Sequence, residues 1–213
     1  MNDTSDPMIR AEIRRRLSAA HLGKDAVIVD ELRVNRGGAR IDVAVVNGHI
    51  DGYEIKSDRD TLQRLDHQVG LYGQVADRMT LVVGESHRDE ALLRIPDWWA
   101  VMVARRAGNG CRLVRDRRGR LNGATSIEAL LRMLERHELI ALLSGHGACK
   151  GASKRSLPDL VATAAGQIPR GEIVAFVRHA LKVRTVFKAL GGMSAYGRSA
   201  IICGPSSKDA GSL

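Results

Sequence analysis

The segment from Arg40 to Lys56 reads RIDVAVVNGHIDGYEIK and predicts two β-strands joined by a turn at Asn47-Gly48. Apolar and polar residues alternate on both sides of this pair, which is a strong local signal for a hairpin. Charged residues stand within the two strands, among them Asp42 and Glu54. A charge in a buried strand is costly unless it is paired or holds a metal ion. The segment therefore predicts either a hairpin with one exposed, charged face or a functional site.

The residue types in this segment suit metal-dependent hydrolysis of a phosphodiester. Asp42 and Glu54 carry carboxylates, and a hard cation such as Mg²⁺ prefers oxygen ligands. A bound cation polarises a phosphoryl oxygen and lowers the pKa of a bound water. Lys56 can orient that water or stabilise charge in the transition state. Because side chains alternate along a strand, Glu54 and Lys56 lie on one face.

The register of the hairpin decides whether the two carboxylates can meet. A strict two-residue turn at Asn47-Gly48 would pair Asp42 with Tyr53 and leave Glu54 on the opposite face. The site therefore requires a turn with an odd number of residues or a β-bulge. The pair Asp51-Gly52 is a candidate for the bulge, because glycine tolerates the left-handed conformation that a bulge often needs.

The segment resembles the core motif of the PD-(D/E)xK, or restriction-endonuclease-like, nuclease superfamily. Asp42 matches its first acid, and Glu54-Ile55-Lys56 matches its (D/E)xK element. Gln68 and Tyr72 match the QxxxY element on the following helix of RecB-type members. A wider pattern over about residues 9 to 105 is similar to a family of small bacterial and phage proteins in this superfamily. That pattern comprises Glu31, Arg40-Ile41-Asp42, Glu54-Ile55-Lys56-Ser57-Asp58, Asp60-Thr61-Leu62, Arg64-Leu65, Gln68 and Tyr72, with Ile41 where the superfamily has proline.

The resemblance implies a fold, an activity and roles for individual residues. The fold would be α/β with a mixed sheet, in the order helix, three-strand antiparallel meander, helix and parallel strand. The activity would be that of a Mg²⁺- or Mn²⁺-dependent deoxyribonuclease, with the metal held by Asp42, Glu54 and the Ile55 carbonyl. Lys56 would act as the catalytic base or stabilise charge. Accessory roles would fall to Glu31, Asp60, Arg64, Gln68 and Tyr72, with Glu12 as the alternative accessory acid to Glu31.

The remaining elements are predicted from hydrophobic periodicity. Helices are expected at residues 9–22, 58–76, 126–144, 157–167 and 172–184, and further strands at 26–35, 78–84, 100–105 and 111–115. A strand at 78–84 that is reached through a helix should lie parallel to the strand before that helix. On the helix at 58–76, Asp60, Arg64, Gln68 and Tyr72 follow one another at i,i+4 spacing and form a polar ridge.

The net charge of +9 is unevenly distributed along the chain. Up to Ala107 there are 16 Lys and Arg against 17 Asp and Glu, and from Gly108 there are 17 against 7. We therefore predict a nuclease-like core at 8–116, a basic helical region at 117–190 and a flexible tail at 191–213. A basic region beside an acidic site would capture the phosphates of a nucleic acid. A solvated surface or a contact with an acidic protein explains the same charge.

The densest basic cluster reads RDRRGR, from Arg115 to Arg120. It would form either a clamp for DNA phosphates or an exposed turn. The residues predicted to bind nucleic acid are Arg40, Arg115, Arg117, Arg118 and Arg120. Aromatic residues make up only 3% of the chain, which argues against binding of single strands by base stacking.

Several observations limit the location and the partners. No apolar run approaches the roughly 18 residues of a membrane span, and no signal peptide is recognised. Three widely spaced cysteines fit a reducing cytosol, so a cytoplasmic location is expected. The expected partner is DNA, in repair, recombination, phage replication or defence, together with a second copy of the chain or another protein at the C-terminal helices. The alternative function is a non-catalytic nucleic-acid-binding or assembly protein that keeps the nuclease-like fold.

Overall fold

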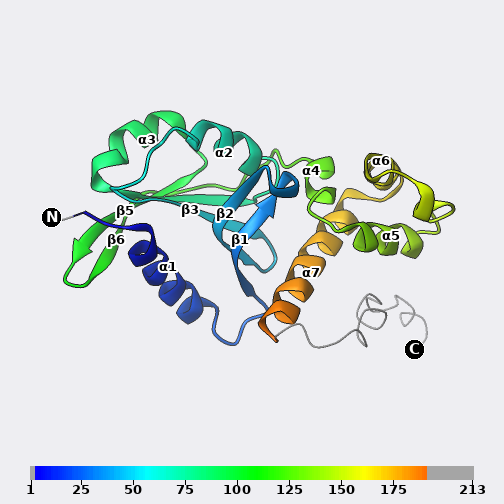
Figure 1. Cartoon of the computed structure of the whole chain (residues 1–213), viewed down its shortest axis with the longest axis horizontal. Helices are drawn as coiled ribbons and strands as arrows, with labels where there is room; N and C mark the ends of the chain where they lie inside the picture. The colour runs from blue at the N-terminus through cyan, green and yellow to red at the C-terminus, as the bar shows by residue number, and fades with distance from the viewer. Residues whose placement is uncertain (1–2, 191–213) are drawn as a thin grey trace, which may run out of the picture.

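A six-stranded mixed β-sheet forms the centre of the computed structural model, which describes residues 3–190 (Figure 1). Its strands, adjacent in chain order, are β1 (Val27–Val34), β2 (Ala39–Val46), β3 (Ile50–Lys56), β4 (Arg78–Gly84), β5 (Ala100–Ala107) and β6 (Gly110–Arg117). The pairs β1–β2, β2–β3 and β5–β6 are antiparallel, whereas β3–β4 and β4–β5 are parallel. The α/β fold with an antiparallel meander and a parallel strand is confirmed. The tail predicted at 191–213 lies outside the described residues.

The turn between β2 and β3 has three residues, as the site requires. Val46 pairs with Ile50, and Val43 pairs with Tyr53. The same register, continued by one residue, sets Asp42 opposite Glu54. The β2–β3 ladder has no bulge, so Gly52 has a different role from the one suggested by sequence. A Cβ atom at Gly52 would lie 2.3 Å from the Met79 Sδ atom, and glycine is therefore needed there for packing.

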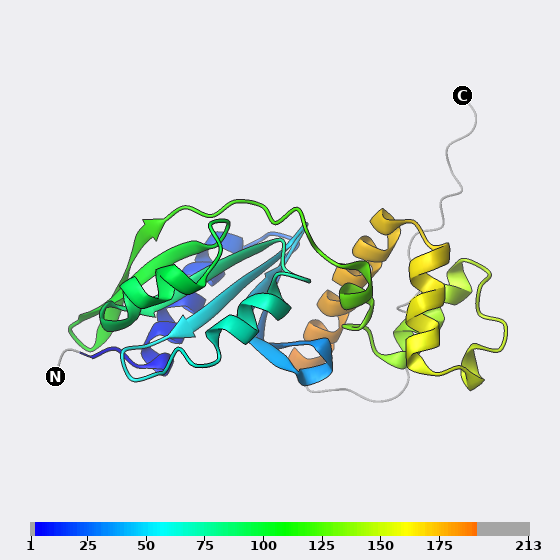
Figure 2. The same ribbon diagram turned by 90° about the horizontal axis from the view of Figure 1, so that it is seen from above.

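Helices cover both faces of the sheet, and further helices follow it (Figures 1 and 2). The helices are α1 (Asp6–His21), α2 (Leu65–Tyr72), α3 (Arg88–Arg94), α4 (Ile127–Leu131), α5 (Arg136–Gly145), α6 (Leu157–Gln167) and α7 (Arg170–Ala189), with short 3₁₀ turns η1 (Asn35–Gly37), η2 (Glu85–His87) and η3 (Ala152–Lys154). The apolar side of α1 packs on one face of the sheet, and α2 and α3 pack on the other. No helix within residues 3–190 is long and apolar enough to cross a membrane.

Two predicted helices differ from the structure for local reasons. The helix predicted at 58–76 is limited to α2, because Asp60 Oδ2 accepts hydrogen bonds from the Ser57 amide and hydroxyl at 2.7 and 2.6 Å. A short polar side chain bonded to nearby backbone in this way competes with the helix. The helix predicted at 126–144 is broken into α4 and α5. Glu135 and Glu138 form a capping box, which starts a new helix.

The C-terminal helices share their apolar core with the sheet. Buried residues of α4 to α7, such as Leu131 and Val177, belong to the same cluster as Ala44 and Leu81 of the sheet. Figure 2 shows these helices to one side of the sheet, and β1 is an edge strand of that sheet. Helix α7 contacts β1 and β2 directly. Helix α7 therefore lies along β1, next to the candidate site.

Candidate active site

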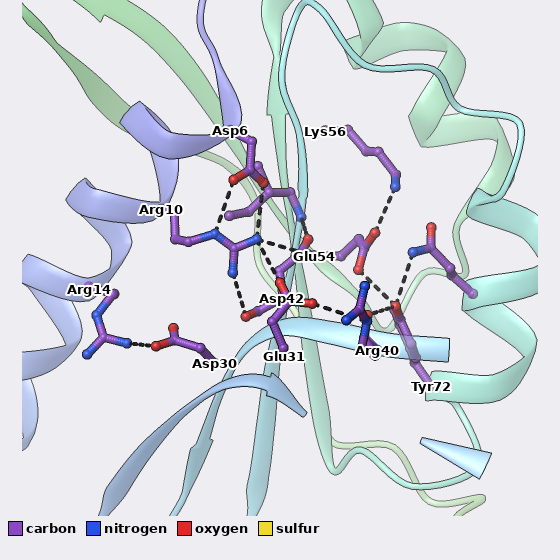
Figure 3. Close-up of polar contacts among 12 residues, drawn as sticks. Asp6, Arg10, Arg14, Asp30, Glu31, Arg40, Asp42, Glu54, Lys56 and Tyr72 are labelled. Atoms are coloured by element: carbon purple, nitrogen blue, oxygen red, sulfur yellow. Dashed lines mark hydrogen bonds and ion pairs between the residues drawn. The ribbon is translucent and has the colours of Figure 1, made fainter. Parts of the chain in front are cut away.

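Most of the site residues predicted from the sequence line a cleft of about 580 Å³. Its walls come from the start of α1, the strands β1, β2 and β3, the turn η1, the segment that leads into α2, and α2 itself. The predicted residues that line it are Glu31, Arg40, Asp42, Glu54, Ile55, Lys56, Asp60, Arg64 and Gln68. Tyr72 reaches it through hydrogen bonds with Glu54 and Gln68. Residues separated by up to 62 positions in the sequence are thus brought to one surface (Figure 3).

Asp42 is held between a strand and a helix. Its Oδ2 atom accepts a hydrogen bond from the Ile55 amide at 2.8 Å. Its Oδ1 atom lies 3.1 Å from Nη2 of Arg10, and Arg10 Nη1 donates to the Asp42 carbonyl at 2.8 Å. Burial raises the pKa of Asp42, although the Ile55 amide and the Arg10 charge act in the opposite direction. The carboxylate is therefore fixed in position at the cleft but only partly neutralised.

Glu54 and Lys56 form a buried ion pair on the same face of β3. Their exposed fractions are 1% and 5%, and Lys56 Nζ lies 2.8 Å from Glu54 Oε1. Burial, together with the negative charge of Asp42, raises the pKa of Glu54 to about 7, although Lys56 and Tyr72 act in the opposite direction. The buried ammonium and the buried carboxylate stabilise each other, because burial of either charge without its partner would cost much free energy. The pair keeps a carboxylate in the cleft that readily exchanges its proton near neutral pH.

Tyr72 links Glu54 to the preceding strand. Its hydroxyl contacts the Arg40 carbonyl, lies 3.0 Å from Glu54 Oε2 and accepts a hydrogen bond from Gln68 Nε2 at 3.1 Å. A hydroxyl has one proton, so it donates either to the carbonyl or to the carboxylate. When the proton goes to the Arg40 carbonyl, a protonated Glu54 can complete the network by donating to Tyr72. Gln68 Oε1 is buried and has no hydrogen-bond partner among residues 3–190.

Arg10 is the main functional residue that the sequence interpretation missed. Its guanidinium lies within 3.1 Å of Asp6, 3.2 Å of Glu31 and 3.1 Å of Asp42, so it bridges three carboxylates (Figure 3). Glu31 adopts a left-handed conformation, with φ of 54°, in the middle of β1. The only local signal was the i,i+4 pair of Asp6 and Arg10 at the start of α1. Such pairs are common on solvated helices, and this one did not single out Arg10.

The two alternatives for the accessory acid lie in different places. Glu31 lines the cleft and pairs with Arg10 and Arg40. Glu12 does not line it; its carboxylate is held by Arg15 and Arg16 at 2.7 Å each. The bond with Arg15 is the main reason that the pKa of Glu12 is lowered to about 2. The structure therefore favours Glu31 over Glu12 as the acid beside the site.

The predicted polar ridge is only partly present. Gln68 and Tyr72 lie on α2 and bond to each other, as their i,i+4 spacing predicts. Arg64 occupies the N-cap position, and Asp60 lies before the helix, in the turn that it closes with Ser57. Both residues still line the cleft. The prediction of one continuous helical ridge was wrong, because the helix starts later than its periodicity suggested.

The cluster Arg115 to Arg120 lies away from the cleft. Arg117 pairs with Val101 at the start of β5, on the edge of the sheet opposite β1. Its guanidinium donates to the Trp99 carbonyl at 3.1 Å and to the Pro96 carbonyl at 2.9 Å. The Arg117 side chain therefore holds the loop that leads into β5. Of the five residues predicted to bind nucleic acid, only Arg40 lines the cleft.

The donor set at the cleft consists of a pair of carboxylates. Among residues 3–190, no three or more His, Cys, Asp or Glu side chains are arranged as a metal-binding group. Asp42 and Glu54 both line the cleft, and carboxylate oxygens are the type of ligand that a hard cation accepts. Burial raises the pKa values of both acids, and a cation beside them would favour their ionised forms. Ile55, whose carbonyl was predicted as the third ligand, also lines the cleft.

The raised pKa of Glu54 predicts that the metal-free protein loses stability as pH rises from about 5 to about 8. Its ordinary pKa of 4.5 describes the unfolded chain, so the folded protein holds the proton more tightly. This stabilising contribution is complete below pH 4.5 and disappears as pH rises through about 7. Asp42 acts in the same direction. The free energy of unfolding should fall by on the order of 2–3 kcal/mol over this range.

Urea unfolding of the wild type and of Glu54→Gln at several pH values tests this prediction. Glutamine does not titrate, so most of the pH dependence between pH 5 and 8 should disappear in the variant. An equal pH dependence in both proteins would show that Glu54 does not carry a raised pKa.

Comparison with known proteins shows the family of this chain. The family model described as Bacteriophage P4 protein cII matches residues 1–190, and the chain belongs to that family. A curated relative is Protein cII of Enterobacteria phage P4, which is 29% identical over 123 residues. The matched region covers 58% of this chain and 47% of the relative, so it spans about half of the relative's length. No solved structure is significantly similar to the chain.

Proposed function

We propose that this member of the Bacteriophage P4 protein cII family is a divalent-metal-dependent nuclease that hydrolyses phosphodiester bonds in DNA. The observation that carries the proposal is the meeting of Asp42, Glu54 and Lys56 in one cleft, where two of the three are almost fully buried. Burial of such charges has a cost that packing alone does not require. We also propose that the fold is restriction-endonuclease-like. The order α1, β1–β2–β3 meander, α2 and parallel β4 supports that assignment.

Each residue of the cleft has a role in the proposed reaction. Asp42, Glu54 and the Ile55 carbonyl would hold Mg²⁺ or Mn²⁺. The bound cation would polarise the phosphoryl group and make a water molecule more acidic. Lys56 would stabilise negative charge on the phosphate or take a proton from the attacking water. Arg10 and the Ile55 amide keep the Asp42 carboxylate in place, because they contact its two oxygens separately.

Tyr72 and Gln68 are proposed as positioning residues. Tyr72→Phe keeps the ring, which stacks on Trp99 with centroids 6.3 Å apart, and removes only the hydroxyl. The hydrogen bond from Tyr72 lowers the pKa of Glu54, so its loss should raise that pKa. Cleavage should slow by about tenfold, and the acidic limb of its pH profile should move to higher pH. A slower rate with an unshifted pH profile would contradict this role for the hydroxyl.

The proposal is tested by cleavage assays on supercoiled, linear duplex and single-stranded DNA. The purified chain should cleave at least one of these with Mg²⁺ or Mn²⁺ and none of them with EDTA. Asp42→Asn, purified in the same way, serves as the control for contaminating nucleases. If the wild type binds DNA but no divalent metal supports cleavage, the nuclease proposal is wrong.

A second function is favoured by the ion pairs of the cleft. Arg10 lies 3.1 Å from Asp42, and Lys56 lies 2.8 Å from Glu54, so each acid already has a cationic partner. A non-catalytic nucleic-acid-binding or assembly protein could use the same cleft as a structural polar network. In that case Asp42→Asn would change only the stability of the fold. The cleavage assay and the unfolding measurement on this one variant therefore separate the two functions.

A further inference from the structure

A second hollow follows the outer edge of the sheet beside the cleft. It has a volume of about 710 Å³ and lies between β1, the segment 132–135 that joins α4 to α5, and the C-terminal half of α7. We call it the β1 groove. Glu31, Arg33 and Arg36 line both the β1 groove and the cleft. The two hollows therefore meet at the end of β1 and at the turn η1.

Six basic and three acidic side chains line the β1 groove, and the acids Asp30, Glu31 and Glu135 already pair with other arginines. Four of the basic residues are left as exposed positive charge. Arg33, Arg36, Arg132 and Lys188 line it, are exposed and form no ion pair within residues 3–190. They come from four separate places: β1, η1, the end of α4 and α7. Like charges gathered in one hollow repel one another, and this repulsion is relieved when a polyanion binds. A row of phosphates is the ligand that matches such an arrangement.

Arg36 stands where the β1 groove meets the cleft, and its backbone is in an unfavourable conformation. Its φ of 56° and ψ of 31° lie in the left-handed region, and Asn35 before it has φ of 47°. Glycine adopts this conformation without cost, whereas arginine does not. Strained residues of this kind persist where the side chain is needed and cluster at ligand sites. Glycine is the usual residue for this backbone conformation in a turn. Here the position holds an arginine, whose guanidinium is available where the β1 groove meets the cleft.

We propose that the β1 groove binds the phosphate backbone of one DNA strand and leads it past Arg36 into the cleft. The proposal rests on the proposed nuclease function for its direction, since the cleft would receive the bond to be cut. Beside its charges, the groove is lined by apolar side chains that are only partly buried, those of Ile28 and Val29. Such side chains can contact sugars and bases of an unpaired strand, whereas a duplex keeps its bases stacked inside. The occupant is therefore a single strand, or the frayed end of a duplex.

The matched test compares two triple variants that remove the same amount of charge. The groove variant carries Arg36→Gln, Arg132→Gln and Lys188→Gln. The control variant carries Arg115→Gln, Arg118→Gln and Arg120→Gln, which are also exposed and form no ion pair within the described chain. Binding of a fluorescein-labelled oligonucleotide, single-stranded or duplex, is measured by anisotropy in EDTA at several salt concentrations. EDTA prevents metal-dependent cleavage, so binding is read independently of the nuclease activity.

The groove variant should bind the single strand at least about tenfold more weakly, and its salt dependence should fall by about 2 units of slope, because roughly 0.7 is lost per phosphate contact. The control variant should change affinity by less than about threefold. Equal losses in both variants, or no loss in the groove variant, would overturn the proposal. So would a wild type that binds no oligonucleotide, which is expected if an acidic protein segment fills the groove. A loss confined to duplex DNA would overturn the assignment of a single strand.

The single variant Arg36→Gly separates a loss of DNA affinity from a loss of fold stability. Glycine relieves the left-handed backbone, so the melting temperature should stay the same or rise while affinity for the single strand falls. Unchanged affinity in this variant would contradict the role of Arg36. The groove and nuclease proposals can fail separately. If the groove variant loses affinity but the wild type cleaves no DNA, the groove proposal holds and the nuclease proposal is wrong. If the wild type cleaves DNA and the groove variant keeps full affinity, the groove proposal is wrong.

Discussion

Asp42→Asn is expected to slow Mg²⁺-dependent DNA cleavage by about 10³-fold, while its DNA affinity stays the same or rises. Asparagine has nearly the shape of aspartate and can still accept the hydrogen bond from the Ile55 amide, which is 2.8 Å from Oδ2 in the wild type. The substitution removes a negative charge that would hold the cation and would repel the phosphate. Single-turnover cleavage and anisotropy in the same Mg²⁺ buffer measure the two effects side by side.

Lys56→Ala provides the contrast to this variant. It should also slow cleavage strongly, but it should leave metal binding in place, because the proposed role of Lys56 is in the transition state. Glu12→Gln is the matched control, since Glu12 is an acid of α1 outside the cleft. If Asp42→Asn and Glu12→Gln cleave at the same rate, Asp42 has no part in the chemistry.

Asp77→Ala is expected to lower the free energy of unfolding by about 3 kcal/mol. The Asp77 carboxylate accepts a hydrogen bond from the Ile50 amide at 2.7 Å and pairs with Arg178 of α7 at 2.9 Å. Both side chains are mostly buried, with exposed fractions of 17% and 22%. Removal of the carboxylate leaves the Ile50 amide without this acceptor and a buried guanidinium without a counter-charge. Urea denaturation at neutral pH measures the loss.

A double-mutant cycle with Arg178→Met shows whether the loss comes from the pair. Methionine fills part of the space of arginine without its charge, so the double variant should be more stable than the sum of the single effects predicts. A loss below about 1 kcal/mol for Asp77→Ala would show that the C-terminal helices do not depend on this contact. Cleavage chemistry is not expected to change in these variants, because Asp77 and Arg178 line a separate cavity of about 210 Å³.

The central part of the fold could be predicted because its signals are local. Alternation in β2 and β3, together with the Asn-Gly pair, predicts the hairpin. The crossover through α2 then makes β4 parallel to β3. The chemistry of the site predicted either a turn with an odd number of residues or a β-bulge, and the structure has the first of these, a three-residue turn. The start of α2 could not be read from periodicity, because the Asp60 side chain bonds the backbone of Ser57 and delays the helix.

The remaining parts of the site depend on contacts between distant residues. Arg10 lies on a helix with several other arginines, and its partner Asp42 is 32 residues away, so no local pattern in the sequence places Arg10 beside Asp42. The basic residues of the β1 groove are similarly scattered, from Arg33 to Lys188. The dense run at Arg115 to Arg120 attracted the prediction of a phosphate clamp, yet it lies on the opposite edge of the sheet. Density along the chain was a poor guide because folding decides which charges meet.

The proposed chemistry requires that Asp42 and Glu54 together bind a divalent cation. Titration of the metal-free protein with Mn²⁺, followed by electron paramagnetic resonance of the free ion, measures this directly. We expect about one Mn²⁺ bound per wild-type chain, loss of that site in Asp42→Asn, and full retention in Lys56→Ala and Glu12→Gln. Binding of no Mn²⁺ by the wild type, or binding that Asp42→Asn leaves unchanged, would contradict this expectation.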